Sequence, residues 1–122
     1  LPLAFNQERK DSDGYHDPLT NPSRLTIPVG QAGTYQMVGN LRWASNTNGS
    51  VRALYIRLNG SDVIAYKDMA PNAGDSILQV TTLYDLAEGD YIELIPVQNS
   101  GGSLDITISA QYSPEFRIQR MA

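Results

Sequence analysis

The chain contains no cysteine. That absence excludes a disulfide framework, a cysteine-based zinc site and a thiol nucleophile. Long hydrophobic runs are also absent, because no apolar stretch approaches the roughly 18 residues that a membrane-spanning helix needs. Apolar residues do not keep a helical spacing over even about ten residues, so the sequence does not predict a helical fold.

Basic residues are few and scattered. Nine lysines and arginines stand against thirteen aspartates and glutamates, which gives a net charge of −4 and an isoelectric point near 4.7. Arg117 and Arg120 near the end of the chain are too few to follow a phosphate backbone. We therefore expect no nucleic-acid partner.

Groups for catalysis are equally sparse. His16 is the only histidine, and no serine lies in a nucleophile-elbow context that it could activate. Glu88, Asp90 and Glu93 lie on a predicted turn and strand, and no pattern makes two of them converge as in a glycosidase. The sequence therefore predicts a protein that is not an enzyme.

What the sequence does contain is a repeated alternation of apolar and polar residues. Its 122 residues, 41% of them hydrophobic, suffice for one domain with a real core. Alternating segments separated by stretches rich in Gly, Asn and Pro predict strands. The predicted strands cover residues 3–5, 24–28, 34–44, 51–58, 63–66, 77–86, 91–97, 104–112 and 116–120. We predict a single all-β domain over residues 1–122, an antiparallel two-sheet sandwich of eight to ten strands.

Two turns are distinctive. In residues 83–94, two alternating segments meet at Ala87-Glu88-Gly89-Asp90, which predicts an antiparallel hairpin with one buried face. Asn59-Gly60 is the strongest short hairpin signal, because both residues of such a turn need positive φ.

One face of each predicted strand supplies the core. The predicted core side chains include Leu25, Ile27, Tyr35, Met37, Leu41, Trp43, Leu54, Ile56, Leu58, Leu104, Ile106 and Ile108. Trp43 shares its face with this set, so we expect it to be buried rather than stacked on a sugar. Gly39 falls on the same face and indicates close packing or a bulge. Tyr66 and Tyr112 lie near strand ends and are freer to be exposed.

The connections differ in length between the two ends of the sandwich. Strand direction alternates, so every second connection lies at the same end. The tight connections at one end are 29–33, 59–61 and 87–90. The longer connections at the other end are 45–50, 68–75 and 98–103, and by the same parity 8–23 joins them.

The longer loops hold the candidate binding residues. Binding groups concentrate on loops held by a rigid scaffold. The candidate ligand-binding residues are Asn46, Asn48, Tyr66, Asn72, Asn99 and Ser100. Polar loops also occur as plain solvated connections, and the sequence leaves that alternative open.

Asp11, Asp13 and Asp17 form the candidate metal site. Calcium prefers several carboxylate and carbonyl oxygens, which this cluster could supply. The spacing lacks the central glycine and the closing glutamate of the common calcium-binding loop. Asp75 beside Gly74 is a second candidate.

A family resemblance rests on several motifs in order. They are Gly14-Tyr15, Leu25-Thr26-Ile27-Pro28-Val29, Ala32-Gly33-Thr34-Tyr35, Leu58-Asn59-Gly60 and Leu86-Ala87-Glu88-Gly89-Asp90-Tyr91-Ile92-Glu93-Leu94. Their spacing resembles the globular head of the complement first component and its tumour-necrosis-factor-like relatives. The likeness covers scattered positions from about residue 14 onward. Ser113-Pro114-Glu115-Phe116 replaces the family's aromatic-Ser-Gly-aromatic ending, and residues 99–112 are longer than a simple loop.

The resemblance implies a ten-stranded jelly roll that assembles as a homotrimer, often at the end of a fibrous stalk. It also implies non-catalytic recognition of proteins, sugars or surfaces, in some members with bound calcium. Sequences this rich in Gly and Asn look like bacterial or tailed-phage members. A trimer is also favoured by Val38 and by Ile77 or Leu78, which lie on faces opposite the core set. The alternative is that those faces pack against the N-terminal segment of the same chain.

Three functional hypotheses remain. The first is a trimeric recognition head of a phage tail or bacterial surface protein, extracellular or virion-associated, that binds a cell-surface receptor or saccharide. The second is a monomeric carbohydrate-binding module of a secreted glycan-active enzyme, and the third is a trimerisation cap without a ligand. Because the chain starts at Leu1 without an initiator methionine or a signal peptide, we expect it to be the C-terminal head module of a longer protein.

Overall fold

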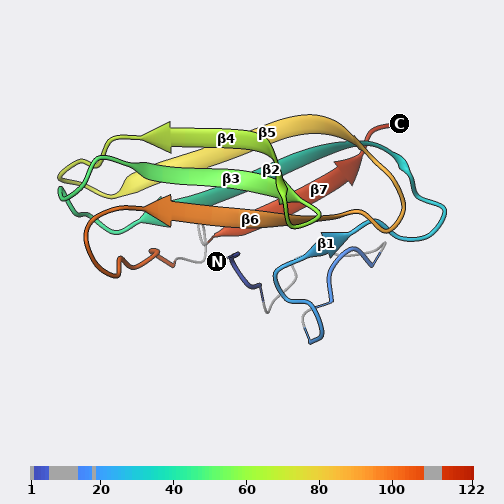
Figure 1. Ribbon diagram of the computed structural model, residues 1–122, viewed down its shortest axis with the longest axis horizontal. Helices are drawn as coiled ribbons and strands as arrows, with labels where there is room; N and C mark the ends of the chain where they lie inside the picture. The colour runs from blue at the N-terminus through green and yellow to red at the C-terminus, as the bar shows by residue number, and fades with distance from the viewer. Residues whose placement is uncertain (1, 6–13, 18, 109–113) are drawn as a thin grey trace.

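The computed structural model describes residues 2–5, 14–17, 19–108 and 114–122. Within this part of the chain the protein is an antiparallel β-sandwich without a helix (Figure 1). Its strands are β1 (Leu25–Thr26), β2 (Gly33–Trp43), β3 (Arg52–Leu58), β4 (Asp62–Met69), β5 (Ser76–Leu86), β6 (Tyr91–Gln98) and β7 (Glu115–Arg120). The predicted all-β sandwich is confirmed.

The strands form two sheets, ordered β1-β6-β3-β4 and β5-β2-β7. Every pair within them is antiparallel. The chain crosses from one sheet to the other after β1, β2, β4, β5 and β6, which is connectivity of the jelly-roll type. The two sheets therefore enclose one core between them.

The described residues contain seven strands, fewer than the predicted eight to ten. Residues 3–5 do not form a strand, although the Leu3 amide donates to the Leu94 carbonyl at 2.9 Å. Of the predicted strand 104–112, the described part makes one isolated bridge, between Ile106 and Trp43, and Ile108 is exposed. Residues 109–112, including Tyr112, lie outside the described residues.

Alternate side chains of facing strands fill the core, as the sequence predicted. Tyr35, Met37, Leu41 and Trp43 on β2 are buried, and so are their counterparts on β1 and β3, Leu25, Leu54, Ile56 and Leu58. Burying one such side chain stabilises the fold by about 1.5–3 kcal/mol. At Gly39 the sheets approach so closely that a Cβ atom would overlap the Leu94 side chain of β6, which confirms the predicted close packing.

The predicted placement of residues 77 and 78 is resolved by the register of β5. Leu78 pairs with Leu41 and is a core residue, so the alternative that placed it opposite the core is wrong. Ile77 pairs with Arg42 on the outer face and is 66% exposed. Val38 is half-buried on the same outer face.

The predicted hairpin over residues 83–94 is wrong, because β5 and β6 belong to different sheets. The turn between them bonds instead to the segment after β1. The Gly89 amide donates to the Ile27 carbonyl, and the Ile27 amide donates to the Asp90 carbonyl, both at 2.9 Å. Both strands send alternate residues into the same core from opposite sides. An alternating pattern therefore identified the buried faces without revealing the pairing.

The hairpin predicted at Asn59-Gly60 is confirmed. β3 pairs with β4, and Asn59 and Gly60 have φ values of 52° and 78°. The Ser61 amide closes the turn on the Leu58 carbonyl at 3.1 Å.

The described N-terminal residues close one side of the sandwich. Leu3 and Phe5 pack against the core, and the Phe5 ring lies 6.3 Å from the Phe116 ring of β7. Leu3 is also bonded to β6, so this segment spans the gap between the edges of the two sheets.

Candidate recognition loops

The three longer connections lie together at one end of the sandwich. They are residues 44–51 between β2 and β3, 70–75 between β4 and β5, and 99–104 after β6. Figure 1 shows all three at the left end, and the hydrogen bonds described below join the first to the third and anchor the second to Thr107, which follows the third. The predicted grouping of 45–50, 68–75 and 98–103 is confirmed. We call residues 44–51, 70–75 and 99–104 the loop rim.

Asn99 joins two of these loops. Its side-chain oxygen accepts hydrogen bonds from the amides of Ser50 and Val51, each at 2.9 Å. Its side-chain nitrogen donates to the Ser50 hydroxyl, also at 2.9 Å. One amide side chain therefore satisfies two successive backbone amides of the first loop, which have no strand partner.

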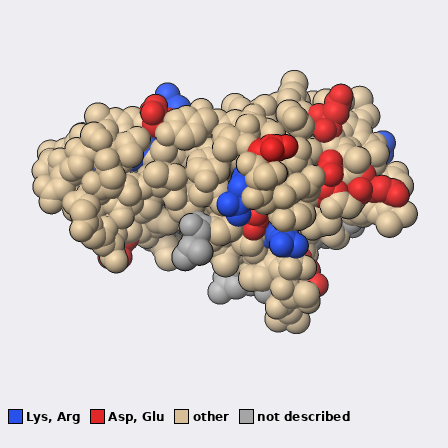
Figure 2. Space-filling model, viewed as in Figure 1, with Lys and Arg blue, Asp and Glu red and all other residues tan. Residues whose placement is uncertain are grey.

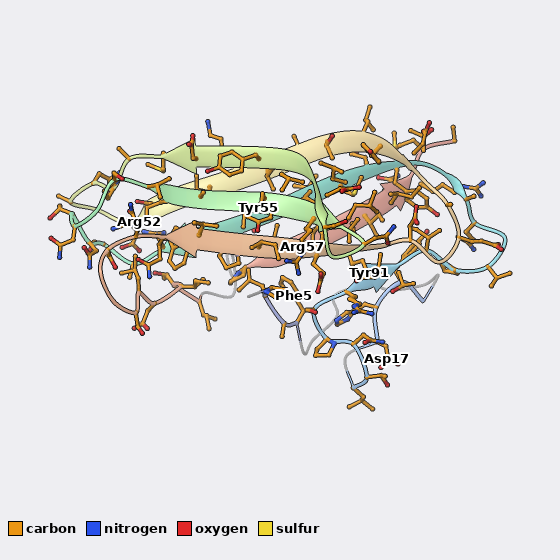
Figure 3. All side chains as sticks on the ribbon, in the orientation of Figure 1. Phe5, Asp17, Arg52, Tyr55, Arg57 and Tyr91 are labelled. Carbon is orange, nitrogen blue, oxygen red and sulfur yellow. The ribbon has the colours of Figure 1, made fainter. Side chains whose placement is uncertain are left out.

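Arg52 holds residues 46–51 of the first loop from their buried side. The side chain is fully buried at the start of β3. Its Nη1 donates to the Val51 carbonyl at 2.8 Å, and its Nη2 donates to the carbonyls of Asn46 and Asn48 at 3.0 and 2.8 Å. No carboxylate pairs with it among the described residues, so loop carbonyls alone compensate the desolvated cation. Residues 46–51 are thus wrapped around a guanidinium (Figure 3).

Asp75 anchors the second loop to the end of β2 and to the segment that follows the third loop. Its Oδ2 accepts from Arg42 Nε at 2.7 Å and from the Thr107 hydroxyl at 3.2 Å. The hydrogen bond from Arg42 lowers the pKa of the Asp75 carboxyl, and the bond from Thr107 adds to this. Asp75 was a candidate calcium ligand, but its Oδ2 already accepts hydrogen bonds from these two donors.

The rim collects most of the predicted binding residues. Asn46, Asn48, Asn99 and Ser100 lie on the two loops that Asn99 connects. Asn46 Oδ1 accepts from the Asn48 amide, and the Ser100 hydroxyl donates to Gln98 Oε1 at 2.6 Å, so these two side chains shape their loops. Asn72 lies exposed on the connection between β4 and β5.

Tyr66 does not belong to the rim. It lies within β4, directly opposite Tyr55 of β3, and it is 55% exposed. The two rings stack with centroids 6.2 Å apart and planes 22° apart. The structure thus separates Tyr66 from the other predicted binding residues.

The surface of the rim is polar but almost uncharged. Residues 44–51 and 99–104 contain no lysine, arginine, aspartate or glutamate, and the only charged residue of 70–75 is Asp75, which Arg42 neutralises. Figure 2 shows this end of the viewed face almost free of charged atoms. Such a surface offers amides, hydroxyls and backbone groups, which suits hydrogen bonding to neutral hydroxyl-rich ligands.

The tight connections gather at the opposite end, as predicted. Glu88 Oε2 accepts from the Gly30 amide at 2.7 Å, which ties the turn after β5 to the turn before β2. Asn59 donates from its side-chain nitrogen to Asp90 Oδ1 at 3.0 Å, which adds the turn between β3 and β4. These short loops leave little freedom for ligand binding.

The expectation that residues 8–23 join the longer loops is wrong for the described residues 14–17 and 19–23. The Tyr15 carbonyl accepts from the Thr26 amide at 2.7 Å, and its hydroxyl donates to Gln31 Oε1 at 3.4 Å. The segment therefore lies beside β1 and the turn that follows it. Alternating strand directions assigned this segment to the wrong end of the sandwich, because β1 has only two residues and pairs with the first residues of β6.

The candidate calcium site is only partly within the described residues. Asp11 and Asp13 lie outside them. Asp17 Oδ1 accepts from the amides of Leu19 and Thr20 at 3.0 and 3.1 Å, and these bonds, that from Thr20 first, lower the pKa of the Asp17 carboxyl. No group of three potential metal ligands occurs within residues 2–5, 14–17, 19–108 and 114–122. The calcium site at Asp11, Asp13 and Asp17 stays a prediction.

His16 has a local contact within its own segment. Its Nε2 lies 2.9 Å from the Pro22 carbonyl oxygen, and because that oxygen can only accept, Nε2 is the donor.

Sequence reasoning missed Arg52 and Asn99 as the residues that organise the rim. A usable signal existed for Arg52, because it continues the inward series of Leu54, Ile56 and Leu58 and so places a charge at a core position. For Asn99 no signal existed, since its partners lie 48 and 49 residues away.

The fold and the loop rim define the class of protein. It is a jelly-roll-type β-sandwich that presents uncharged polar loops at one end. A comparison of the sequence with known proteins found no matching family model and no matching curated protein. Among the described residues, no helix has the length and apolar character to cross a membrane.

Proposed function

We propose that this protein is a non-catalytic recognition head that binds a cell-surface saccharide or receptor through the loop rim. The head acts as a homotrimer on a phage tail or a bacterial surface protein, outside the cell or on the virion. The observation that supports this most strongly is the convergence of three long, uncharged loops that Asn99, Arg52 and Asp75 fix in place.

A fixed rim favours recognition over a plain solvated connection. Flexible loops must lose conformational entropy when they bind, whereas a loop that is already ordered loses less. Arg52 supplies that order from a fully buried position, and it leaves the exposed side chains of Asn48 and Thr47 free for a ligand.

The outer face of the β5-β2-β7 sheet supports the trimer. Ile77 and Leu83 on β5 are 66% and 61% exposed, and Val38 on β2, which pairs with Thr81 between them, is half-buried on the same face. Apolar side chains on a sheet face that the chain itself leaves uncovered suit burial against another copy.

The second candidate function is a monomeric carbohydrate-binding module. The exposed Tyr66, stacked on Tyr55, favours it because flat rings stack on sugar faces. Sedimentation velocity over a range of concentrations separates the two: a stable trimer supports the head, and a monomer at every concentration supports the module.

A glycan array tests recognition by the rim. We expect the double variant Asn48→Ala, Asn72→Ala to lose binding, because both side chains are exposed and neither makes a hydrogen bond among the described residues. Ser61→Ala, at the opposite end, is the matched control and should bind like the wild type. Unchanged binding by the double variant would refute the rim as the binding surface and favour the module that binds through Tyr66, whereas an array without any bound glycan would favour the trimerisation cap.

A further inference from the structure

We infer that the outer face of the β1-β6-β3-β4 sheet holds a second binding site, which takes a saccharide that carries a carboxylate. The site is a strip of three tyrosines, two arginines and one glutamate, separate from the loop rim. It consists of Tyr66, Tyr55, Arg57, Glu93, Tyr91 and Arg24.

The sheet register places these residues in one row. Tyr66 lies opposite Tyr55, and Arg57 follows Tyr55 by two residues on the same face of β3. Glu93 lies opposite Arg57, and Tyr91 precedes Glu93 by two residues on β6. Figure 3 shows Tyr55, Arg57 and Tyr91 succeeding one another along the front of the sheet.

Arg24 completes the strip with a guanidinium that is held in place but not neutralised. Its Cζ lies 3.9 Å from the centroid of the Tyr91 ring. Among the described residues its side chain has neither a hydrogen bond nor an ion pair, so its planar fork of donors stays available. Stacking on an aromatic ring orients an arginine without using its hydrogen-bond donors.

Arg57 is oriented by an acid that balances only one of the two cations. Arg57 Nη2 donates to Glu93 Oε1 at 2.9 Å, and Glu93 Oε2 accepts from the Ser23 hydroxyl at 3.0 Å. Glu93 is 5% exposed, so both of its oxygens are occupied and shielded. Two arginines against one glutamate leave the strip with a net charge of +1, on a chain whose net charge is −4. Figure 2 shows basic and acidic atoms side by side near the middle of this face.

This arrangement matches the chemistry of an acidic sugar. A carboxylate accepts two parallel hydrogen bonds from an arginine fork, and the planar geometry makes the contact specific. The stacked rings of Tyr55 and Tyr66 offer an apolar platform for the C–H face of a pyranose. A neutral sugar would use only the platform, so the charge of the strip selects the acidic one.

Isothermal titration calorimetry of the full chain tests this inference with three probes: 3′-sialyllactose, a glucuronic-acid disaccharide and lactose. We expect at least one acidic probe to bind tenfold or more tightly than lactose. Arg24→Gln should weaken that binding at least tenfold, and Arg24→Lys should weaken it less because it keeps the charge but not the fork. Raising the salt concentration should also weaken it.

Arg117→Gln is the control, because Arg117 is exposed on the outer face of the other sheet. Equal unfolding midpoints for the wild type and the Arg24 variants establish that loss of binding is not loss of fold. Equal affinity for lactose and the acidic probes, no binding of either acidic probe at millimolar concentration, or an unchanged affinity of Arg24→Gln would each overturn the inference. None of these outcomes bears on the loop rim, whose variants are tested separately.

Discussion

Asn99 and Arg52 illustrate how much of the loop rim depends on single side chains. Each one bonds to several backbone groups of residues 46–51, Asn99 through amide hydrogens and Arg52 through carbonyls. Loops without strand partners need such side-chain bonds, because their backbone groups have no ladder to join. The composition of the loop predicted polarity, whereas the two side chains determine its shape.

Replacing Asn99 by alanine should loosen the loop without unfolding the sandwich. The amides of Ser50 and Val51 then lose their acceptor. Water can reach this exposed site, so we expect the free energy of unfolding to fall by only about 1–2 kcal/mol. Hydrogen exchange at those two amides should speed up selectively. Asn72→Ala, which removes no hydrogen bond within the described residues, should leave their exchange unchanged; equal exchange in both variants would contradict this role.

Gly39 is required by the distance between the sheets. An alanine there would force its Cβ into the Leu94 side chain, which is fully buried and cannot swing into solvent. Overpacking of this kind costs about 1–3 kcal/mol, so Gly39→Ala should lower the urea midpoint. Gly102→Ala, where a Cβ would meet no atom within 4 Å, is the control. Equal midpoints for both variants would show that the sheets can separate at no cost.

Asp75 should make stability depend on pH in the acid range. Its folded-state pKa is lowered by Arg42, so its carboxylate stabilises the fold above the unfolded-state pKa of about 3.9. That contribution is lost as the pH falls through the lower folded-state pKa. We would measure the free energy of unfolding in urea at pH 7 and at pH 3. The wild type should exceed Asp75→Asn in stability by more at pH 7 than at pH 3.

Asp105→Asn serves as the control for this pH effect, because the Asp105 side chain makes no ion pair among the described residues. A difference between the wild type and Asp75→Asn that is equally large at both pH values would contradict the assigned role of the ion pair.

At the scale of single elements, two similar-looking turns behave differently. Asn59-Gly60 closes a true hairpin, whereas Gly89-Asp90 carries the chain from one sheet to the other. The first could be predicted because its signal is local: both residues adopt positive φ. The second could not, because its backbone partner, Ile27, is more than sixty residues away in sequence.

The Asn59-Gly60 turn should be sensitive to the loss of its glycine. Gly60 has φ of 78°, a conformation that costs an alanine about 1–2 kcal/mol. Gly60→Ala should thus lower the denaturant midpoint by a corresponding amount, whereas Gly74→Ala, at a position without positive φ, should change it little. An unchanged midpoint for Gly60→Ala would contradict the assigned turn.

At the scale of the whole molecule, the sequence predicted at which end of the sandwich each loop lies better than it predicted which strands pair with one another. The alternating pattern was sufficient to place residues 45–50, 68–75 and 98–103 at one end, because each strand reverses direction. It could not place residues 14–17 and 19–23, because β1 is too short to determine the direction of the preceding segment. Most of the core set was likewise predictable, with Ile108 as an exception, while the strip of tyrosines and arginines was not, since its members come from three strands and a loop.

The most direct test of the loop rim is hydrogen–deuterium exchange with and without the saccharide that binds most strongly on the glycan array. The structure predicts slower exchange in residues 44–51, 70–75 and 99–104 when that saccharide is bound, with little change at residues 59–61 and 87–90. Slower exchange elsewhere with the loop rim unchanged would contradict the account.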